Sequence, residues 1–258
     1  MARDTALMAR ARVSGETVFA VYSWTRPTLS IGRNQAARGT YDAAEAARRG
    51  IDIVRRPTGG RALLHHREVT YSVTAPVSAE GTLRDTYQRI NRILMKGLQS
   101  LGVQVDEADP KTYTGRPDER PCFAEPARGE LITDGRKLVG SAQWHDDGAL
   151  LQHGSILIDD DQRLIRDLTL DLSRPGNAND VSATSTIAIA PTAVRTEPAT
   201  LKNALGRSTS VEEVAASLFD AVQTLEDEDA MVMDESDIRD AAAALVPHYE
   251  SKLWTWRQ

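Results

Sequence analysis

The chain has 258 residues, of which 41% are hydrophobic and 26% are charged. This balance is typical of a folded globular protein and excludes an intrinsically disordered one. The length is sufficient for one large domain whose core needs neither disulfides nor a metal. No apolar run approaches the roughly 18 residues of a membrane span, and we expect neither a membrane segment nor a signal peptide.

Charge is distributed unevenly along the chain. The net charge is −6, from 31 basic and 37 acidic side chains. Residues 1–75 carry 12 basic and 6 acidic side chains, a net charge of +6, whereas residues 76–258 carry 19 and 31, a net charge of −12. Such an acidic protein is not a general binder of nucleic acid. The basic first third indicates either a contact with a small anion or an acidic partner protein, or a high arginine usage without meaning for partners.

The sequence contains a single cysteine, Cys122. One cysteine excludes a disulfide within the chain and a zinc site built from several cysteines. The expected location is therefore the reducing cytoplasm. The thiol itself is either a small buried hydrophobic group or a nucleophile.

The first half of the chain is predicted to contain strands and two helices. Alternating and β-branched residues indicate strands at residues 18–24, 28–32, 51–55 and 68–75. A short helix is predicted at residues 41–49, ending at Gly50. The clearest helix covers residues 83–101, because its apolar residues recur at steps of three and four before Gly102. We expect a glycine-containing turn at residues 55–66 and a loop at residues 111–121.

The second half is predicted to begin with a hairpin and to end in helices. Residues 130–134 and 137–143 flank Asp134-Gly135, a strong signal for a type I′ turn, and residues 149–158 form a further strand. Helical patterns cover residues 211–225 and 236–245, and the acidic cluster at 226–229 is interpreted as a solvated loop. Without regular βαβ alternation, we predict an α+β fold with a largely antiparallel sheet. A single domain is expected over residues 1–258, with a helical carboxy-terminal portion from about residue 198.

The predicted turn has the sequence RRPTGGRA, at residues 55–62. Glycines allow close approach of backbone to a ligand, and arginines can hold a carboxylate or phosphate, so the candidate binding residues are Arg55, Arg56, Gly59 and Gly60. The alternative is a plain hairpin turn, because neither a Walker loop nor a dinucleotide fingerprint is present. His65 and His66 are adjacent on a strand and face opposite sides, so we expect no metal site.

Lys137 lies in a segment of small residues, GRKLVGSAQ at residues 135–143. A lysine beside open backbone can polarise an acyl carbonyl, and the alternative is a surface lysine on a hairpin.

Four segments of the chain resemble the family of lipoate–protein ligase A and the octanoyltransferases. They are RRPTGGRALLHHREVTYS at residues 55–72, Cys122-Phe123, GRKLVGSAQ at 135–143 and LQHGSI at 151–156. The resemblance covers nearly the whole chain, from DTALM at residues 4–8 to Tyr249, Trp254 and Arg257. It implies the α+β fold shared with biotin protein ligase and, distantly, with class II aminoacyl-tRNA synthetases.

The resemblance implies acyl transfer in protein lipoylation. An octanoyl group would move from acyl carrier protein to a lysine of a lipoyl domain through a thioester on Cys122, with Lys137 beside it as the second catalytic residue. The acceptors would be the glycine-cleavage H protein or the acyltransferase subunits of 2-oxoacid dehydrogenases. The enzyme would be a cytoplasmic monomer that needs no cofactor and binds neither nucleic acid nor membrane.

Three alternatives remain. An ATP-dependent lipoate–protein ligase would need ATP and magnesium, and Cys122 would be incidental. An amidotransferase would move the acyl chain between lipoyl domains. A non-catalytic binder of acyl chains or lipoyl domains would keep only the fold.

The resemblance also assigns roles around the thiol. The expected substrate-binding residues are Arg55, Arg56, Gly59, Gly60, His65, Gly140, Ser141, Ala142 and His153. Lys137 and backbone amides near Gly140 and Ser141 would stabilise the oxyanion, and Lys137 or His65 would accept the proton of the attacking amine. Walls for the octanoyl tail are expected around residues 59–60 and 69–73, and burial of its seven carbons would contribute about 5–6 kcal/mol at about 0.8 kcal/mol each.

The sequence departs from the family in two places. It begins inside the amino-terminal motif, so either the given sequence starts late or the strand that usually precedes this motif is absent, and an absent strand would leave a sheet edge exposed. Many members have Pro-Ser-x-Tyr-Glu shortly after the Cys-Phe pair, where this chain has EPARGE at residues 125–130. The second departure affects the loop that follows the thiol and the docking of acyl carrier protein.

Overall fold

The computed structural model describes residues 1–77, 82–109, 122–123, 126–127, 129–170 and 197–257. The expected loop at 111–121 lies outside these residues. Within them, no helix is long and apolar enough to cross a membrane.

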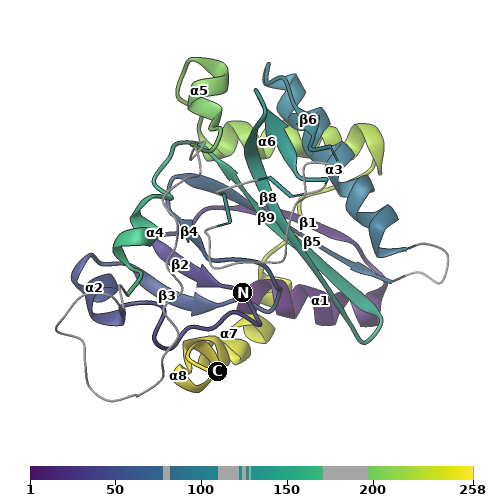
Figure 1. The fold of residues 1–258 in the computed structure, drawn as a ribbon. Coiled ribbons are helices and arrows are strands. Elements are labelled where there is room, and N and C mark those ends of the chain that lie inside the picture. Colours follow the sequence, from purple (N-terminus) through teal and green to yellow (C-terminus); the bar gives the residue numbers. More distant parts are fainter. Residues whose placement is uncertain (78–81, 110–121, 124–125, 128, 171–196, 258) are drawn as a thin grey trace.

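A six-stranded antiparallel sheet forms the centre of the fold (Figure 1). Its strands, in spatial order, are β1 (Val18–Tyr22), β5 (Glu68–Pro76), β9 (Ala149–Leu157), β8 (Arg136–Asp146), β7 (Leu131–Thr133) and β6 (Asp106–Glu107). The hairpin of β7 and β8 turns at Asp134 and Gly135, whose φ values of 50° and 69° are those of a type I′ turn. The predicted hairpin is therefore confirmed, and β5, β9 and β8 place three of the sequence motifs side by side.

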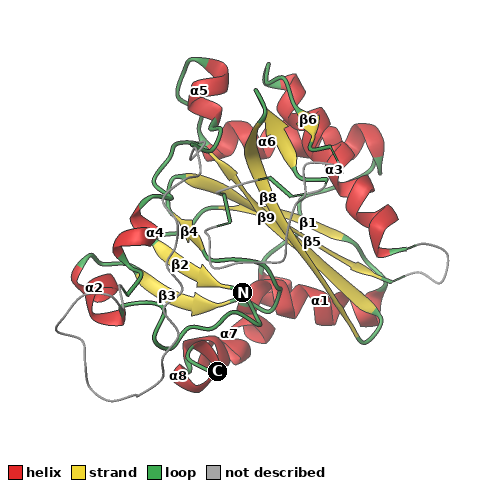
Figure 2. Cartoon of the chain, viewed as in Figure 1, coloured by secondary structure: helices red, strands yellow, loops and turns green. Residues whose placement is uncertain are grey.

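A second, three-stranded sheet lies beside the first (Figure 2). β2 (Thr28–Ile31) pairs in parallel with β3 (Asp52–Arg55) and antiparallel with β4 (Leu63–His65). The helix α2 (Ala43–Arg48) connects the parallel pair. The prediction of one sheet was wrong here, and residues 55–66 are more than a turn. A strand as short as β4 has no readable period, so only the structure reveals it.

Helices cover the large sheet. α1 (Ala2–Ser14) packs against β5, β9 and the carboxy-terminal helix α7 (Ser236–Glu250), while α3 (Leu83–Ser100) packs against α6 (Val211–Leu225). The short helices are α4 (Leu164–Asp167), α5 (Leu201–Leu205) and α8 (Lys252–Thr255). These helices confirm the α+β prediction and the helical character of the last sixty residues.

Alternation along β5 separates the two faces of the large sheet. Val69, Tyr71 and Val73 pack into the main hydrophobic core together with residues of α3 and α6. Thr70 lies on the opposite face, toward the small sheet, where it joins His65. The expected wall of an acyl site at residues 69–73 is therefore wrong for Val69, Tyr71 and Val73, because a two-residue period directs them away from the pocket.

Candidate active site

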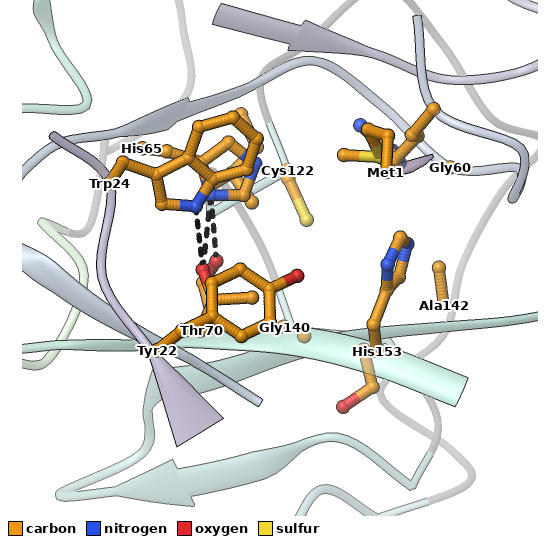
Figure 3. A pocket seen from close by; sticks show the side chains of 15 residues that line it. Met1, Tyr22, Trp24, Gly60, His65, Thr70, Cys122, Gly140, Ala142 and His153 are labelled. Atoms are coloured by element: carbon orange, nitrogen blue, oxygen red, sulfur yellow. Dashed lines mark hydrogen bonds between the residues drawn. The ribbon is translucent and has the colours of Figure 1, made fainter. Parts of the chain in front are cut away.

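A pocket lies between the small sheet and the face of the large sheet that carries Thr70. It encloses about 420 Å³ of empty space, part of it open to solvent. Strands β5, β9 and β8 supply one wall, β1 and the segment after it a second, and the glycine turn and β4 a third (Figure 3). Its described lining residues are Met1, Tyr22, Trp24, Arg56, Gly60, Leu63, His65, Thr70, Cys122, Gly140, Ser141, Ala142, His153, Gly154 and Ser155.

Cys122 and Lys137 meet at this pocket, as the resemblance implied. The Lys137 ammonium lies 3.4 Å from the Cys122 sulfur and donates a 2.7 Å hydrogen bond to the Cys122 carbonyl. It also donates at 2.7 Å to the carboxylate of Glu130, which sequence reasoning did not identify. Burial lowers the pKa of Lys137, but the neighbouring Cys122 and Glu130 outweigh it, so its pKa is raised and the side chain is a cation.

Gly140 permits the close approach of the thiol and the amine. A Cβ atom at this position would lie 3.1 Å from Lys137 Cε and 3.2 Å from Cys122 Sγ. A side chain here would press on both reactive groups, which would have to shift by a few tenths of an ångström. This is a physical reason for the small residues that the sequence shows at residues 140–142.

The register of β8 and β9 determines which predicted residues face the pocket. Gly140 pairs with Ser155 and Ala142 with His153, so these four positions share one face. Ser141 lies between them, and its hydroxyl forms a 2.6 Å hydrogen bond with Tyr71 on the other face. The Ser141 hydroxyl is thus directed away from the pocket, and the expected role of its backbone amide stays a prediction.

The two arginines of the glycine turn are structural. Arg55 is 1% exposed and donates to six backbone carbonyls: those of Gly32, Arg33, Gln35, Trp254, Thr255 and Arg257. It does not line the pocket, so its geometry contradicts a substrate contact. Arg56 borders the pocket, but it donates to Ser30 and to the carbonyls of Gly59 and Arg61. Its charge holds the turn together rather than meeting an external anion.

The two glycines of the turn differ in their surroundings. Gly60 lines the pocket with φ of 92°, and a Cβ there would lie 2.8 Å from Arg56 Nη2. This backbone conformation and contact require glycine. Gly59 has open space around it and is absent from the lining residues. The expected close approach to a ligand is thus limited to Gly60.

His65 is held in a hydrogen-bonded chain. Its Nε2 lies 2.8 Å from the Ser30 hydroxyl, its Nδ1 lies 3.1 Å from Glu68 Oε1, and its ring stacks on Trp24 at 4.3 Å. His66 points the other way and contacts Asp161 at 2.7 Å, as the alternation of a strand predicts. No group of three or more potential metal ligands occurs in the described part of the chain.

His153 lines the pocket and has a carboxylate behind it. Its Nδ1 lies 3.3 Å from Asp4 Oδ2 and its Nε2 lies 2.6 Å from the Thr58 hydroxyl. Burial and the charge of Arg56 lower the pKa of His153, although Asp4 opposes them, so the imidazole is neutral at pH 7. Neither Asp4 nor Thr58 was predicted as a site residue. They lie far from His153 in the sequence, and the sequence does not show that α1, β9 and the glycine turn converge.

Residues 1–223 match the model of the lipoyl protein ligase A/B catalytic domain. The chain belongs to this family. The match confirms the resemblance on which the sequence analysis relied, while the extension of one domain to residue 258 stays a prediction.

Relatives of this catalytic-domain family with about 40% identity are named octanoyltransferase LipM. That of Carboxydothermus hydrogenoformans is 41% identical over 162 residues, covering 61% of this chain and 60% of the relative. That of Kyrpidia tusciae is 42% identical over 167 residues, covering 62% and 61%, and that of Staphylococcus aureus is 40% identical over 172 residues, covering 62% of each. The matched part thus spans about three fifths of these relatives.

Solved structures of proteins described as lipoate protein ligases share the fold. Lipoate-protein ligase A bound with ATP has a TM-score of 0.74 at 18% identity, covering 99% of this chain and 92% of that one. The bi-partite lipoate protein ligase from Thermoplasma acidophilum has a TM-score of 0.70 at 18% identity, covering 99% and 89%. These similarities confirm the predicted lipoate-ligase fold.

Proposed function

We propose that this chain is an octanoyltransferase that carries the octanoyl group as a thioester on Cys122. The observation that carries the proposal is the Lys137 ammonium 3.4 Å from the sulfur of Cys122, a residue that lines the pocket. The similarity to proteins named octanoyltransferase LipM supports the same activity. The donor is octanoyl–acyl carrier protein, and the acceptor is a lysine of a lipoyl domain.

The first half-reaction loads the enzyme. The Cys122 sulfur attacks the donor thioester, and the cationic Lys137 favours the thiolate and then the oxyanion by its charge. On an antiparallel strand, successive amides point alternately toward β9 and toward the other side of β8. Of the backbone amides of Gly140 and Ser141, one therefore points away from β9. We propose that this amide donates a hydrogen bond to the oxyanion.

The acyl tail occupies the pocket. The pocket is bounded by strands of both sheets and is partly open to solvent, which gives the tail a route of entry. The polar side chains on its walls are already engaged with one another, as in the contacts of Trp24, Thr70 and His65. A hydrocarbon tail makes no further hydrogen-bonding demand, and burial of its seven carbons contributes about 5–6 kcal/mol.

The thiol favours the transferase over the ATP-dependent ligase. A ligase would activate the acid as an adenylate and would make no use of a cysteine beside a buried lysine. We therefore propose a reaction without ATP or metal. Mixing the protein with octanoyl–acyl carrier protein in the absence of ATP should increase the intact mass of the protein by one octanoyl group. The Cys122→Ser variant should form no octanoyl thioester. Ligation that requires lipoate and ATP, with no adduct on wild type in their absence, would refute the proposal.

A further inference from the structure

Four of the described residues that line the pocket carry a hydroxyl group, and Ser155 of β9 differs from the other three. Its side chain borders the pocket although bulk solvent does not reach it. Its one described side-chain contact is with His65 Nδ1, at 3.4 Å. The other hydroxyls are already paired: Tyr22 donates to Asp4 at 3.1 Å, Thr70 donates to Glu68 at 2.6 Å, and Ser141 bonds with Tyr71 at 2.6 Å.

The contact with His65 does not use the hydrogen of the Ser155 hydroxyl. Arg56 can only donate, and it donates to the Ser30 hydroxyl at 3.0 Å. The Ser30 hydrogen is therefore directed to His65 Nε2, which lies 2.8 Å away. The other ring nitrogen, Nδ1, lies 3.1 Å from the Glu68 carboxylate and carries the ring proton. It cannot accept a second proton, so the Ser155 hydrogen has no acceptor within the described part of the chain. Because both ring nitrogens of His65 are engaged, the expected transfer of the amine proton to His65 is not supported.

An unpaired hydroxyl at this position indicates that a substrate supplies the acceptor. A buried polar group that has lost its water without gaining a partner lowers stability. Most buried polar groups are paired for this reason, and an exception at a reactive site calls for a functional explanation. The hydrocarbon tail of an octanoyl group offers no acceptor, whereas the carbonyl oxygen of its thioester does.

The sheet places Ser155 beside the reacting sulfur. Ser155 pairs with Gly140 across β9 and β8, and the Cβ positions of directly paired residues are about 4.5–5.5 Å apart. A Cβ atom on Gly140 would lie 3.2 Å from the Cys122 sulfur. Leu157, two residues along the same face of β9, belongs to the small apolar cluster against which Cys122 packs. Figure 3 shows the Cys122 thiol directed into the open space of the pocket. A carbonyl group bonded to this sulfur is therefore within hydrogen-bonding reach of Ser155.

We propose that Ser155 is a catalytic residue whose hydroxyl donates a hydrogen bond to the thioester oxyanion, an inference that rests on the proposed octanoyltransferase function. When the Cys122 thiolate bonds to the thioester carbon of the donor, an electron pair moves from the carbonyl double bond to its oxygen. Ser155 donates to this oxygen, next to the charge of Lys137. The pair returns as the bond to the donor sulfur breaks, and the donor thiolate takes from solvent the proton that Cys122 released.

The test changes the acceptor oxygen of the donor as well as the hydroxyl of the enzyme. Loading of Cys122 is followed in single turnovers by intact mass, with octanoyl–acyl carrier protein and with its dithio analogue, in which sulfur replaces the carbonyl oxygen. At saturating ordinary donor, Ser155→Ala should load about 100-fold more slowly than wild type. Sulfur is a weak acceptor, so from the analogue Ser155→Ala should load at most about threefold more slowly than wild type.

Three controls separate this role from a structural one. Because Ser155→Ala removes a hydroxyl whose hydrogen is unpaired, its denaturation midpoint should not fall below that of wild type. Ser155→Gly removes the same hydroxyl and should show the same dependence on the donor. Thr70→Val changes the residue that pairs with Ser155 on β5, where the hydroxyl already donates to Glu68. It should change loading from both donors by the same factor.

Equal slowing with both donors in Ser155→Ala, or loading from the ordinary donor at the wild-type rate, would overturn the inference and leave the proposed function in place. A lower denaturation midpoint for Ser155→Ala would show that the hydroxyl has a partner in the fold, and would overturn it as well. Absence of any octanoyl adduct on wild-type Cys122 would overturn the proposed function at the first step, and this inference with it.

Discussion

Substitution of Gly140 by alanine tests the geometry on which the reaction depends. The added methyl group would lie 3.1 Å from Lys137 Cε, 3.2 Å from Cys122 Sγ and 3.3 Å from Lys137 Nζ. Comfortable contacts between such atoms are about 3.5–4.0 Å, so the neighbours must retreat by a few tenths of an ångström. The strand is fixed by β9, and the displacement therefore falls on the thiol and the ammonium, which are 3.4 Å apart.

Two effects of known size follow for Gly140→Ala. Overpacking costs about 1–3 kcal/mol of unfolding free energy. A misplacement of about 1 Å in a reacting pair slows catalysis by about 100-fold, so a displacement of a few tenths of an ångström should slow loading of Cys122 by about three- to tenfold. Denaturant unfolding measures the first effect, and single-turnover loading followed by intact mass measures the second.

Ser141→Ala is the matched control for Gly140→Ala. It changes the next residue of the same strand, but its hydroxyl faces Tyr71 on the other side of the sheet. It should lose about 1 kcal/mol of stability with the hydrogen bond and load at the wild-type rate. Wild-type loading by Gly140→Ala would refute the placement of the thiol and the amine above this glycine.

Three further predictions concern buried charges. Glu130→Ala should lower the unfolding free energy by about 3–5 kcal/mol, because it leaves the buried Lys137 ammonium without its carboxylate. It also removes a group that raises the pKa of Lys137, so a rate–pH profile of loading should show its alkaline limit at lower pH. Arg55→Met should lower the unfolding free energy by about 3 kcal/mol or more in denaturant, since it leaves six carbonyls without their donor, whereas the exposed Arg48→Ala should behave as wild type. Burial lowers the pKa of His153 in the folded state below its ordinary value of 6.5, so acidification from about pH 7.5 to about 5.5 should reduce the Tm of the wild-type protein. The His153→Asn variant should lose less Tm over the same range. An equal loss of Tm in wild type and variant would contradict the lowered pKa of His153.

The elements that were predictable are those whose signal is local. The 3.6-residue period of residues 83–101 and the Asp134-Gly135 turn are set by neighbours in the chain, and both appear in the structure with bounds within one or two residues. The meeting of Cys122 with Lys137 could be predicted only through the resemblance, because a sequence separation of 15 gives no indication of their distance in space.

The residues that were missed act through contacts between distant segments. Glu130 is one acidic residue among 37 acidic ones, and only its burial against Lys137 distinguishes it. Arg55 resembles an anion-binding arginine in a glycine turn, yet the carboxy-terminal residues Trp254–Arg257 supply three of its acceptors. A pattern of residue types does not distinguish an arginine that binds a ligand from one that binds backbone.

The basic first third of the sequence is largely compensated within the fold. Five of its arginines pair with carboxylates from beyond residue 145: Arg3 with Glu235, Arg10 with Asp237, Arg12 with Asp146, Arg49 with Asp167 and Arg67 with Asp159. Two more, Arg55 and Arg56, are buried. The positive excess of residues 1–75 and the negative excess of the remainder therefore neutralise each other across the interfaces of α1, α2 and β5 with later elements. Charge counted along the chain thus gives no support for a basic docking face, because most of the cations that it counts are engaged with later parts of the same chain.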